Sequence, residues 1–397
     1  MASQFRILQI INRIPFPLND GGNIAAWYVA HYLKKFGHSV DLAFLNTNKH
    51  HEAPQSIAAG YRNFFYTDIN TNITVTGLLK SFFSETAYNI ERFRSKEFEK
   101  VLTNALKENE YDFIQIEGAY MALYIPLLRR LSNAKIVLRS HNIEHQIWER
   151  LALHTTNPLK KVFIQQLAKK IKTFEETTLH QFDAIVAITP DDEAYYRSKN
   201  YKGKLTTIQA GFEDSLIQNP VKKPYSVCFI GSMQWMPNTE GIEWFLKEVW
   251  PLVLKEVPEA KFYIAGKGMD ASFDKWNRPG VILEGLVPNA SDFIQNHNVF
   301  VVPLRSGGGM RLKVVEAMGM CMPIVSTTIG AEGIHCIPNE DILICDTPTE
   351  LKNGIVLLLQ NEALARQIAQ HARNRAVSEY SWETLISGFE KMYKELE

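Results

Sequence analysis

The stretch from residue 299 to 333, VFVVPLRSGGGMRLKVVEAMGMCMPIVSTTIGAEG, is the most informative part of this chain for its fold. Its apolar start, 299–303, has the composition of a buried parallel strand. The loop 305–309 then carries three glycines in a row, and apolar residues recur at helical spacing over 312–318. These features predict a parallel α/β sheet in which a glycine loop joins the carboxyl end of a strand to the first turn of a helix.

Such a loop can bind anions, because the first turn of a helix has unpaired N–H groups and a partial positive charge, and glycines let the backbone approach a ligand closely. Arg311 and Lys313 add two positive charges that oppose the helix dipole, so we interpret them as partners of a bound polyanion rather than as local stabilisers. Glu316, one turn further on, is placed to accept hydrogen bonds from sugar hydroxyls of the same ligand. The glycines that would approach the anion are Gly307, Gly308 and Gly309. The alternative is a surface loop with solvated charges.

The stretch resembles the donor-binding segment of family 4 glycosyltransferases, which are retaining nucleotide-sugar enzymes with the GT-B fold. Glu316-Ala317-Met318 matches the second glutamate of the family pattern, whose role there is to hold the ribose of the nucleotide. The first glutamate of that pattern contacts hydroxyls of the donor sugar, and it falls on Gly308, eight positions earlier, so it is absent here. The form Arg-x-Gly-Gly-Gly-x-Arg-x-Lys-x-x-Glu-Ala-Met resembles a bacterial subgroup of the family.

The 397 residues are enough for two domains of ordinary size, and a composition of 46% apolar and 22% charged residues is that of a globular protein. Lys+Arg and Asp+Glu are both 43, so no net charge attracts nucleic acid. The four cysteines form no Cys-x-x-Cys pair, which favours reduced thiols. The chain opens without the pattern of a signal peptide, and no apolar segment reaches the roughly 18 residues that a membrane span needs. We therefore expect a cytoplasmic protein that binds no nucleic acid.

The chain begins with an apolar strand at 5–11, a loop at 12–22 rich in Pro, Gly and Asn, a helix, and a second strand at 40–44. This order opens a doubly wound, Rossmann-like domain, but no Gly-x-Gly-x-x-Gly fingerprint of an NAD site is present. By resemblance, Gly21 and Gly22 match the family's glycine loop, which meets the acceptor or the donor phosphates. The alternative is a tight turn that needs glycine.

Two later strands of this half, at 112–116 and 135–139, are followed by polar residues. Ligands of doubly wound sheets bind beyond the carboxyl ends of strands, where Glu117, His141 and Asn142 lie. The resemblance implies that His141 faces the donor sugar, and we assign Glu117 and Asn142 to the acceptor side.

The same histidine belongs to a competing motif. The segment 141–145, His-Asn-Ile-Glu-His, fits the zinc-protease pattern His-x-x-Glu-His. A pattern this short occurs in many chains, and His141 follows a strand, where it is a loop residue rather than a helical one. A helix cap beside a surface histidine is the other alternative. We expect no metal.

Residues 211–224 break the periodic pattern and read as a linker, after which strands and helices alternate again. The last segment, 381–396, reads as a separate helix, and GT-B enzymes return their final helix to the first domain. We therefore predict an acceptor-side domain of residues 1–212, with 381–397 crossing back onto it, and a nucleotide-sugar domain of residues 222–380.

Family members often carry an Arg and a Lys after the first strand of the second domain, where they hold the diphosphate, but the loop 231–238 has neither. We infer that Arg311 and Lys313 have taken over that task. Ser232 offers a further hydrogen-bond donor in this loop, and we also place Val287 at the nucleotide.

Together these features predict the GT-B fold, with two doubly wound Rossmann-like α/β domains facing across a cleft. The predicted activity is retaining transfer of a sugar from a nucleoside diphosphate sugar to a glycan or lipid-linked acceptor in bacterial surface polysaccharide or glycoconjugate synthesis, with neither cofactor nor metal. An oxocarbenium-like transition state would place charge on the leaving diphosphate, beside Arg311 and Lys313. A sugar-nucleotide epimerase and a non-catalytic carbohydrate-binding relative are the alternatives, because fold alone does not decide function.

The segment 158–180 alternates lysines with apolar residues, as a basic amphipathic helix does. Such a helix fits an anionic lipid surface, so we expect peripheral contact with the inner membrane surface. The alternative is an ordinary packed helix with a solvated face. The lysines are Lys160, Lys161, Lys169, Lys170 and Lys172.

Overall fold

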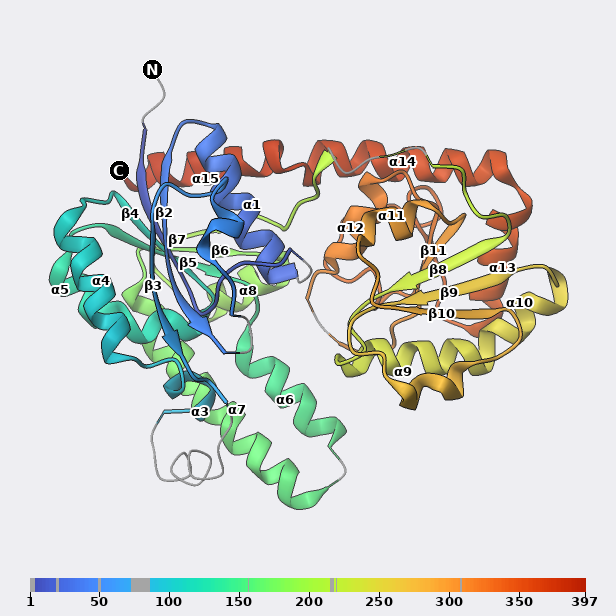
Figure 1. Ribbon diagram of the computed structural model, residues 1–397, viewed down its shortest axis with the longest axis horizontal. Coiled ribbons are helices and arrows are strands. Elements are labelled where there is room, and N and C mark those ends of the chain that lie inside the picture. The colour runs from blue at the N-terminus through green and yellow to red at the C-terminus, as the bar shows by residue number, and fades with distance from the viewer. Residues whose placement is uncertain are drawn as a thin grey trace. The chain divides into compact units, whose positions relative to one another are not determined.

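The chain folds into two compact units, each built on a parallel sheet (Figure 1). Unit 1 comprises Met1–Gln209 and Leu385–Glu397, and unit 2 comprises Ala210–Thr384. The computed structural model describes residues 4–18, 21–48, 51–72, 86–155, 157–214, 218, 220–307 and 309–397.

In the residues that the structure describes, unit 1 has a seven-stranded parallel sheet with the order β3-β2-β1-β4-β5-β6-β7, the arrangement of a doubly wound fold. Its strands are β1 (Arg6–Ile11), β2 (Ser39–Thr47), β3 (Phe64–Ile69), β4 (Phe113–Glu117), β5 (Lys135–Ser140), β6 (Ala184–Ala187) and β7 (Lys204–Thr207). Its helices are α1 (Gly21–Lys35), α3 (Tyr88–Glu91), α4 (Lys96–Glu108), α5 (Ile125–Leu131), α6 (Glu144–His154), α7 (Pro158–Thr178), α8 (Pro190–Ser198) and most of α15 (Trp382–Leu396).

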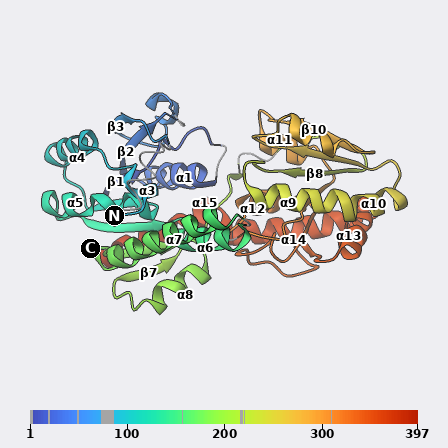
Figure 2. The same ribbon diagram turned by 90° about the horizontal axis from the view of Figure 1, so that it is seen from below.

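The described part of unit 2 has a six-stranded parallel sheet with the order β10-β9-β8-β11-β12-β13. Figure 1 shows α11 and α12 on one side of this sheet and α9 on the other, and Figure 2 again places β8 between α11 and α9. The strands are β8 (Ser226–Ile230), β9 (Lys261–Ala265), β10 (Val281–Gly285), β11 (Val299–Val302), β12 (Ile324–Ser326) and β13 (Leu343–Ile344). The helices are α9 (Met236–Trp244), α10 (Trp250–Glu256), α11 (Ala290–Gln295), α12 (Leu312–Gly319), α13 (Pro348–Gln360) and α14 (Glu362–Tyr380).

Local sequence explains where several helices begin and end. The hydroxyl of Ser95 accepts a hydrogen bond from the N–H of Phe98 at the start of α4. Thr347 and Glu350 form a reciprocal capping box at the start of α13. Beyond the end of α1, Gly37 has a φ of 96°, a left-handed conformation that glycine adopts without strain.

The last helix completes the core of unit 1. Phe389 and Tyr393 of α15 are fully buried, and the rings of Tyr393 and Phe113 lie 4.4 Å apart. Full burial of an aromatic side chain stabilises a fold by roughly 1.5–3 kcal/mol. Leu385–Glu397 therefore belongs to unit 1, although more than 170 residues of unit 2 precede it along the chain.

Two elements differ from the sequence-based expectations. The edge strand β3 was not predicted, because none of its residues is buried and its mixed pattern lacks the apolar run of a central strand. The helical segment after β8 is also less regular than the alternating pattern of the sequence suggests, because a π-helical turn, Phe245–Val249, lies between α9 and α10. Within the described ranges, no helix combines the length and the apolarity needed to cross a membrane.

Candidate functional site

In unit 2, the loops after β8 and β9 touch through their backbones, and the end of β11 touches the backbone of α9. A Cβ atom on Gly266, whose φ is 150°, would lie 1.7 Å from the carbonyl oxygen of Gly231. A Cβ atom on Gly241 of α9 would lie 2.5 Å from the carbonyl oxygen of Pro303, just after β11. Only glycine permits these approaches. The carboxyl ends of β8, β9 and β11 therefore gather at one edge, where ligands of doubly wound sheets bind.

Lys313 of α12 brings an amine to this edge. Its Nζ donates hydrogen bonds to the carbonyl of Ile230, at the end of β8, and to Oδ1 of Asn238, over 3.3 and 3.2 Å. The amine also lies 4.1 Å from the centre of the Phe229 ring. Burial, helped by the nearby charge of Arg311, lowers the pKa of Lys313 to about 7. From the sequence we predicted that this charge contacts the diphosphate. The structure places the amine at the end of β8, before the loop in which members of the resembled family often carry an Arg and a Lys and this chain has neither.

Arg311, the N-cap residue of α12, is 6% exposed and held on several sides. Its Nη1 donates to the carbonyl of Gly309 over 2.8 Å, and its guanidinium lies 5.0 Å from the Trp235 ring centre. Its Nη2 lies 3.8 Å from a carboxylate oxygen of Glu332. Gly307, with φ of 110°, leaves space for this packing, because a Cβ there would come within 2.9 Å of Nη2. The protein itself therefore provides contacts to Arg311 that the sequence did not indicate, and whether they stabilise the empty protein is tested below.

Glu316 lies one turn further along α12 and is partly buried. Burial raises the pKa of its carboxyl group to about 7. Among the described residues, none forms a hydrogen bond or an ion pair with this carboxylate. A partly buried carboxylate without a protein partner is a ready acceptor for ligand hydroxyls.

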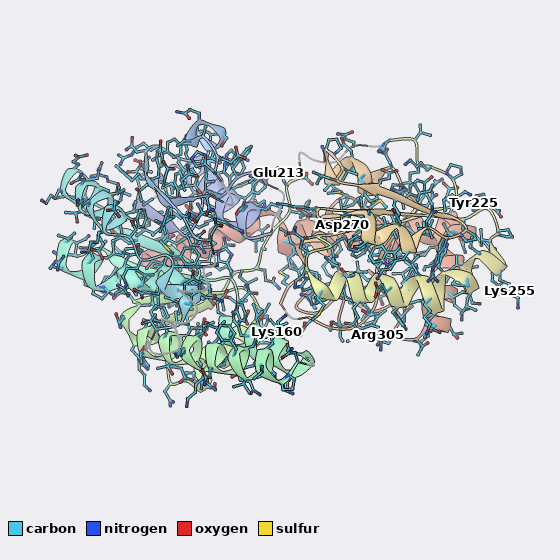
Figure 3. All side chains as sticks on the ribbon, turned by 60° about the horizontal axis from the view of Figure 1, so that its bottom comes forward. Lys160, Glu213, Tyr225, Lys255, Asp270 and Arg305 are labelled. Atoms are coloured by element: carbon cyan, nitrogen blue, oxygen red, sulfur yellow. The ribbon has the colours of Figure 1, made fainter. Side chains whose placement is uncertain are left out.

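The other donor-side predictions fall nearby in the fold. Ser232 is exposed in the loop after β8, and its carbonyl accepts a hydrogen bond from Nδ2 of Asn238 over 2.8 Å. Val287 follows β10 and packs against the core of unit 2. Gly309 adopts a φ of 80°, whereas Gly308 lies outside the described residues. Figure 3 labels Arg305, which opens the glycine loop.

In unit 1, Glu117 and His141 meet, as their positions at strand ends suggested. Oε2 of the buried Glu117 lies 2.6 Å from Nε2 of His141. Oε1 of Glu117 accepts hydrogen bonds from the side-chain amides of Gln9 and Gln115, both over 2.6 Å, and Nη1 of Arg139 lies 3.7 Å from Oε2. Burial by itself would raise the pKa of Glu117, but the charge of Arg139 and the bonds from His141 and Gln9 outweigh it and hold the pKa at about 2.

Sequence reasoning overlooked three of these residues, Gln9, Gln115 and Arg139. Each is a polar residue in an otherwise apolar strand, β1, β4 and β5. Such a residue must find a partner when it is buried, and this signal was present in the sequence.

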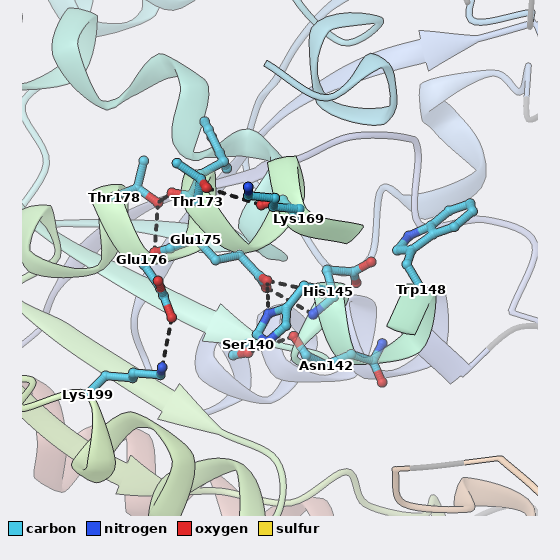
Figure 4. Close-up of polar contacts among 12 residues, drawn as sticks. Ser140, Asn142, His145, Trp148, Lys169, Thr173, Glu175, Glu176, Thr178 and Lys199 are labelled. Atoms are coloured by element: carbon cyan, nitrogen blue, oxygen red, sulfur yellow. Dashed lines mark hydrogen bonds and ion pairs between the residues drawn. The ribbon is translucent and has the colours of Figure 1, made fainter. Parts of the chain in front are cut away.

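Asn142 and His145 have structural partners, shown in Figure 4. The carbonyl of Asn142 accepts a hydrogen bond from Ser140 Oγ over 3.1 Å. Nδ1 of His145 lies 2.7 Å from Oε2 of Glu175, whose carboxylate also accepts the first N–H groups of α6. His141 and His145 are thus bound to different carboxylates. In the described segments, no group of three His, Cys, Asp or Glu side chains is gathered to hold a metal ion.

Gly21 and Gly22 are the first two residues of α1 rather than the end of a loop. Gly21 is exposed and Gly22 partly buried, and Asn23 donates a side-chain hydrogen bond to the carbonyl of Pro17 over 3.1 Å. Their predicted role at a phosphate stays a prediction, now placed at a helix N-terminus.

Two family models together match most of the chain. One is described as "Glycosyltransferase Family 4" and matches residues 19–216, and the other as "Glycosyl transferases group 1" and matches residues 224–361. An uncharacterized 44.6 kDa protein in the cps region of Klebsiella pneumoniae is 24% identical, over 97% of this chain and 99% of that protein.

Solved structures share the fold. Sucrose-phosphate synthase from Thermosynechococcus elongatus has a TM-score of 0.71 at 17% identity, over 98% of this chain and 99% of that one. Anabaena Alr3699/HepE in complex with UDP-glucose has a TM-score of 0.65 at 11% identity, over 99% and 100% of the two chains. These likenesses identify the fold as GT-B, the two-sheet architecture expected from the sequence.

Proposed function

Because this chain belongs to glycosyltransferase family 4, we propose that it moves a sugar from a nucleoside diphosphate sugar to a glycan or lipid-linked acceptor, with retention at the anomeric carbon. Its similarity to a protein in a cps region supports a role in the synthesis of a bacterial surface polysaccharide. The complex of a GT-B relative with UDP-glucose supports a uridine diphosphate sugar as the first donor to test.

The observation that carries this proposal is the amine of Lys313 at the carboxyl end of β8. Its hydrogen-bond partners are one carbonyl and one amide oxygen, and no carboxylate in the described chain lies within 4.0 Å of it. The ammonium form of Lys313 therefore has no opposite charge beside it among the described residues. A diphosphate bound at this edge would neutralise it, next to the glycine loop and the start of α12.

The proposed chemistry follows from that placement. The bond between the anomeric carbon and the diphosphate oxygen breaks through an oxocarbenium-like state, and negative charge develops on the diphosphate. Lys313 and Arg311 stabilise this charge without a divalent metal, because they are already in position when the charge develops. Glu316 accepts hydrogen bonds from the ribose hydroxyls. The acceptor hydroxyl oxygen bonds to the face that the diphosphate leaves, and its proton passes to the departing diphosphate oxygen, so the anomeric configuration is retained.

The two units have different proposed roles. Unit 2 holds the nucleotide sugar through Lys313, Arg311, Glu316 and the glycine loop. Unit 1 supplies His141 to the reacting sugar, and Asn142 and the start of α1 serve the acceptor side. The buried Glu117 contacts His141.

A panel of UDP, GDP and ADP sugars tests the proposal. We expect one nucleoside diphosphate to raise the melting temperature, and the matching sugar donor to give a product of unchanged anomeric configuration by NMR when acceptors are added. Binding of no nucleoside diphosphate would contradict the donor site. Conversion of the donor to an epimer without any acceptor would identify a sugar-nucleotide epimerase, and binding without any conversion a non-catalytic relative.

We further propose that the α6–α7 hairpin rests on the cytoplasmic face of an anionic membrane, which would bring the enzyme to a lipid-linked acceptor. Figure 1 shows α6 and α7 side by side, and Figure 3 labels Lys160 near the start of α7. Leu153 and Leu159, beside the turn between the helices, are 72% and 85% exposed, and Val162 is 51% exposed. Between residues 146 and 172 the sequence has six lysines or arginines and one acidic residue.

Basic residues around exposed leucines match an anionic bilayer, which attracts the charges and takes up the apolar side chains. Flotation with vesicles that contain phosphatidylglycerol should carry the protein upward at low salt, and neutral vesicles should not. Leu153→Ser with Leu159→Ser should weaken flotation, whereas Leu286→Ser, at a 71% exposed leucine of unit 2, should not. Equal flotation of all three proteins would place the contact elsewhere, and no flotation would end the idea.

A further inference from the structure

The polar side chains around Glu117 form one connected network on a single face of the unit 1 sheet. Side chains two residues apart on a strand share a face, so Gln115 and Glu117 of β4 point the same way. The register places Gln9 of β1 beside Gln115, and Arg139 of β5 beside Glu117. Two tyrosines complete the network, Tyr61 with its hydroxyl 2.6 Å from Gln9 Oε1 and Tyr393 of α15 at 2.5 Å from Gln115 Oε1.

The hydrogen bonds between the side chains of this network run toward Glu117, and Gln9 Nε2 also donates to the carbonyl of Ala26. Burial raises the pKa of both Tyr61 and Tyr393, so the hydroxyls keep their protons and donate to the glutamine oxygens. Each glutamine then has its NH₂ group left to face Glu117, and a carboxylate can only accept. The reverse orientation would set amide oxygens against a carboxylate.

From this directed network we infer that Glu117 is a positioning residue that keeps the ring proton of His141 on Nε2 and so presents Nδ1 as a hydrogen-bond acceptor to a hydroxyl of the reacting sugar. The inference rests on the proposed function, in which His141 contacts that sugar. The His141 side chain keeps 17% exposure, and no group in the described chain forms a hydrogen bond with Nδ1. The Nδ1 edge of the ring is therefore a hydrogen-bond acceptor, because the ionised carboxylate of Glu117 holds the ring proton on Nε2.

Replacing Glu117 with glutamine should invert this arrangement with little change of shape. Gln9 and Gln115 both donate to the position of Oε1, so the new amide places its oxygen there and turns its NH₂ toward His141. Nε2 must then accept, and the ring proton moves to Nδ1. His141 would present a donor where the wild type presents an acceptor, as an asparagine does in the aspartate position of serine-protease triads.

The test has two readouts. Nitrogen-15 NMR of labelled histidine should show His141 with its proton on Nε2 in the wild type and on Nδ1 in Glu117→Gln, the signal being assigned by its loss in His141→Ala. The same substitution should lower kcat by about 100-fold or more and change KM for the donor less. The double variant Glu117→Gln with His141→Ala should be no slower than His141→Ala alone, because Glu117 acts through the ring.

The second buried pair, His145 and Glu175, gives a matched control, since Glu175→Gln alters the same chemistry outside the proposed site and should leave kcat within about 2-fold. A wild-type proton on Nδ1 overturns the inference, and this holds even if Glu117→Gln does not fold. Unchanged kcat in a folded Glu117→Gln overturns it as well, as do additive losses in the double variant. A wild type that transfers no sugar refutes the proposed function instead, and the NMR result then still decides where the proton lies.

Discussion

Two carboxylates beside the two parallel sheets have opposite surroundings. Glu117, at the end of β4 in unit 1, accepts three hydrogen bonds, lies beside Arg139 and has a pKa of about 2. Glu316, on the helix after β11 in unit 2, has no hydrogen-bond partner among the described residues, and burial raises its pKa to about 7. The cluster in unit 1 is complete without a ligand, so it orients other groups. The carboxylate of Glu316 in unit 2 has no such protein partners among the described residues, as is typical of a residue that binds a ligand.

Two cations of unit 2, Arg311 and Lys313, also differ in their surroundings although they lie two residues apart. Arg311 stacks on Trp235 and faces Glu332, whereas the acceptors of Lys313 among the described residues are neutral. We therefore expect Arg311 and Lys313 to differ in how much each stabilises the protein without a ligand. Four predictions test these differences between the two units and between the two cations.

The largest effect is expected from Lys313→Gln. Loss of a preorganised charge beside the leaving group should lower kcat/KM by about 10²–10³-fold. The folded pKa of Lys313 lies below its unfolded value, so folding at pH 7–10 favours loss of a proton and stability rises with pH across that range. The substitution removes this cost, and the empty variant should melt at the same temperature or higher. Lys247→Gln, at a 74% exposed side chain of the same unit, is the control for both measurements. A large loss of stability without a ligand would make Lys313 a structural residue.

The next effect concerns pH. The folded pKa of Glu117 lies below the unfolded value, so its contribution to stability is complete above pH 4.5 and is lost as the pH falls toward 2. The full contribution is about 3 kcal/mol. Denaturant unfolding of wild type and Glu117→Gln should therefore converge between pH 4.5 and 3, by up to about 1.4 kcal/mol per pH unit. Glu316→Gln should differ from wild type over a separate window, pH 4.5 to 7, with the variant gaining as the pH rises. If both variants differ in stability from the wild type over the same pH range, the two carboxylates do not have the opposite pKa shifts described above.

Arg311→Gln should separate the two cations. We expect it to lower the free energy of unfolding of the empty protein by about 2 kcal/mol, through loss of the Trp235 stack and of a buried charged hydrogen bond. Because the sequence alone suggested no such cost, this result would show that the contacts of Arg311 matter. An unchanged melting temperature would instead restore the interpretation that Arg311 serves only the ligand.

The smallest effect is expected from Glu316→Ala. Loss of ribose hydrogen bonds should weaken nucleoside diphosphate binding by about 0.5–1.5 kcal/mol for each bond, measured by calorimetry. Binding of inorganic diphosphate should not change, since the proposal assigns it to Lys313 and Arg311. Unchanged affinity for the nucleotide would remove Glu316 from the site.

Much of the fold was readable from the sequence because its signals are local. Apolar runs marked most of the central strands, and helical spacing with a glycine loop marked the β11–α12 turn. The positions of Glu117 and His141 after neighbouring strands predicted a shared location, since parallel strands end at one edge. Strand β3 escaped prediction because an edge strand is covered on few sides and needs no apolar run.

The class of sheet, the glycine loop, the glutamate of α12 and the residues at strand ends could all be read from the sequence. Which charges are paired depends on the tertiary structure. Lys313 reaches Ile230, 83 residues earlier, and Tyr393 reaches Gln115 across 278 residues. The register of β1, β4 and β5 sets Gln9, Gln115 and Arg139 around Glu117. Whether a charged side chain is neutralised depends on atoms within about 4 Å of it, and those atoms come from distant parts of the chain. Sequence spacing therefore indicated where the ionisable groups lie, and packing decided their protonation and their partners.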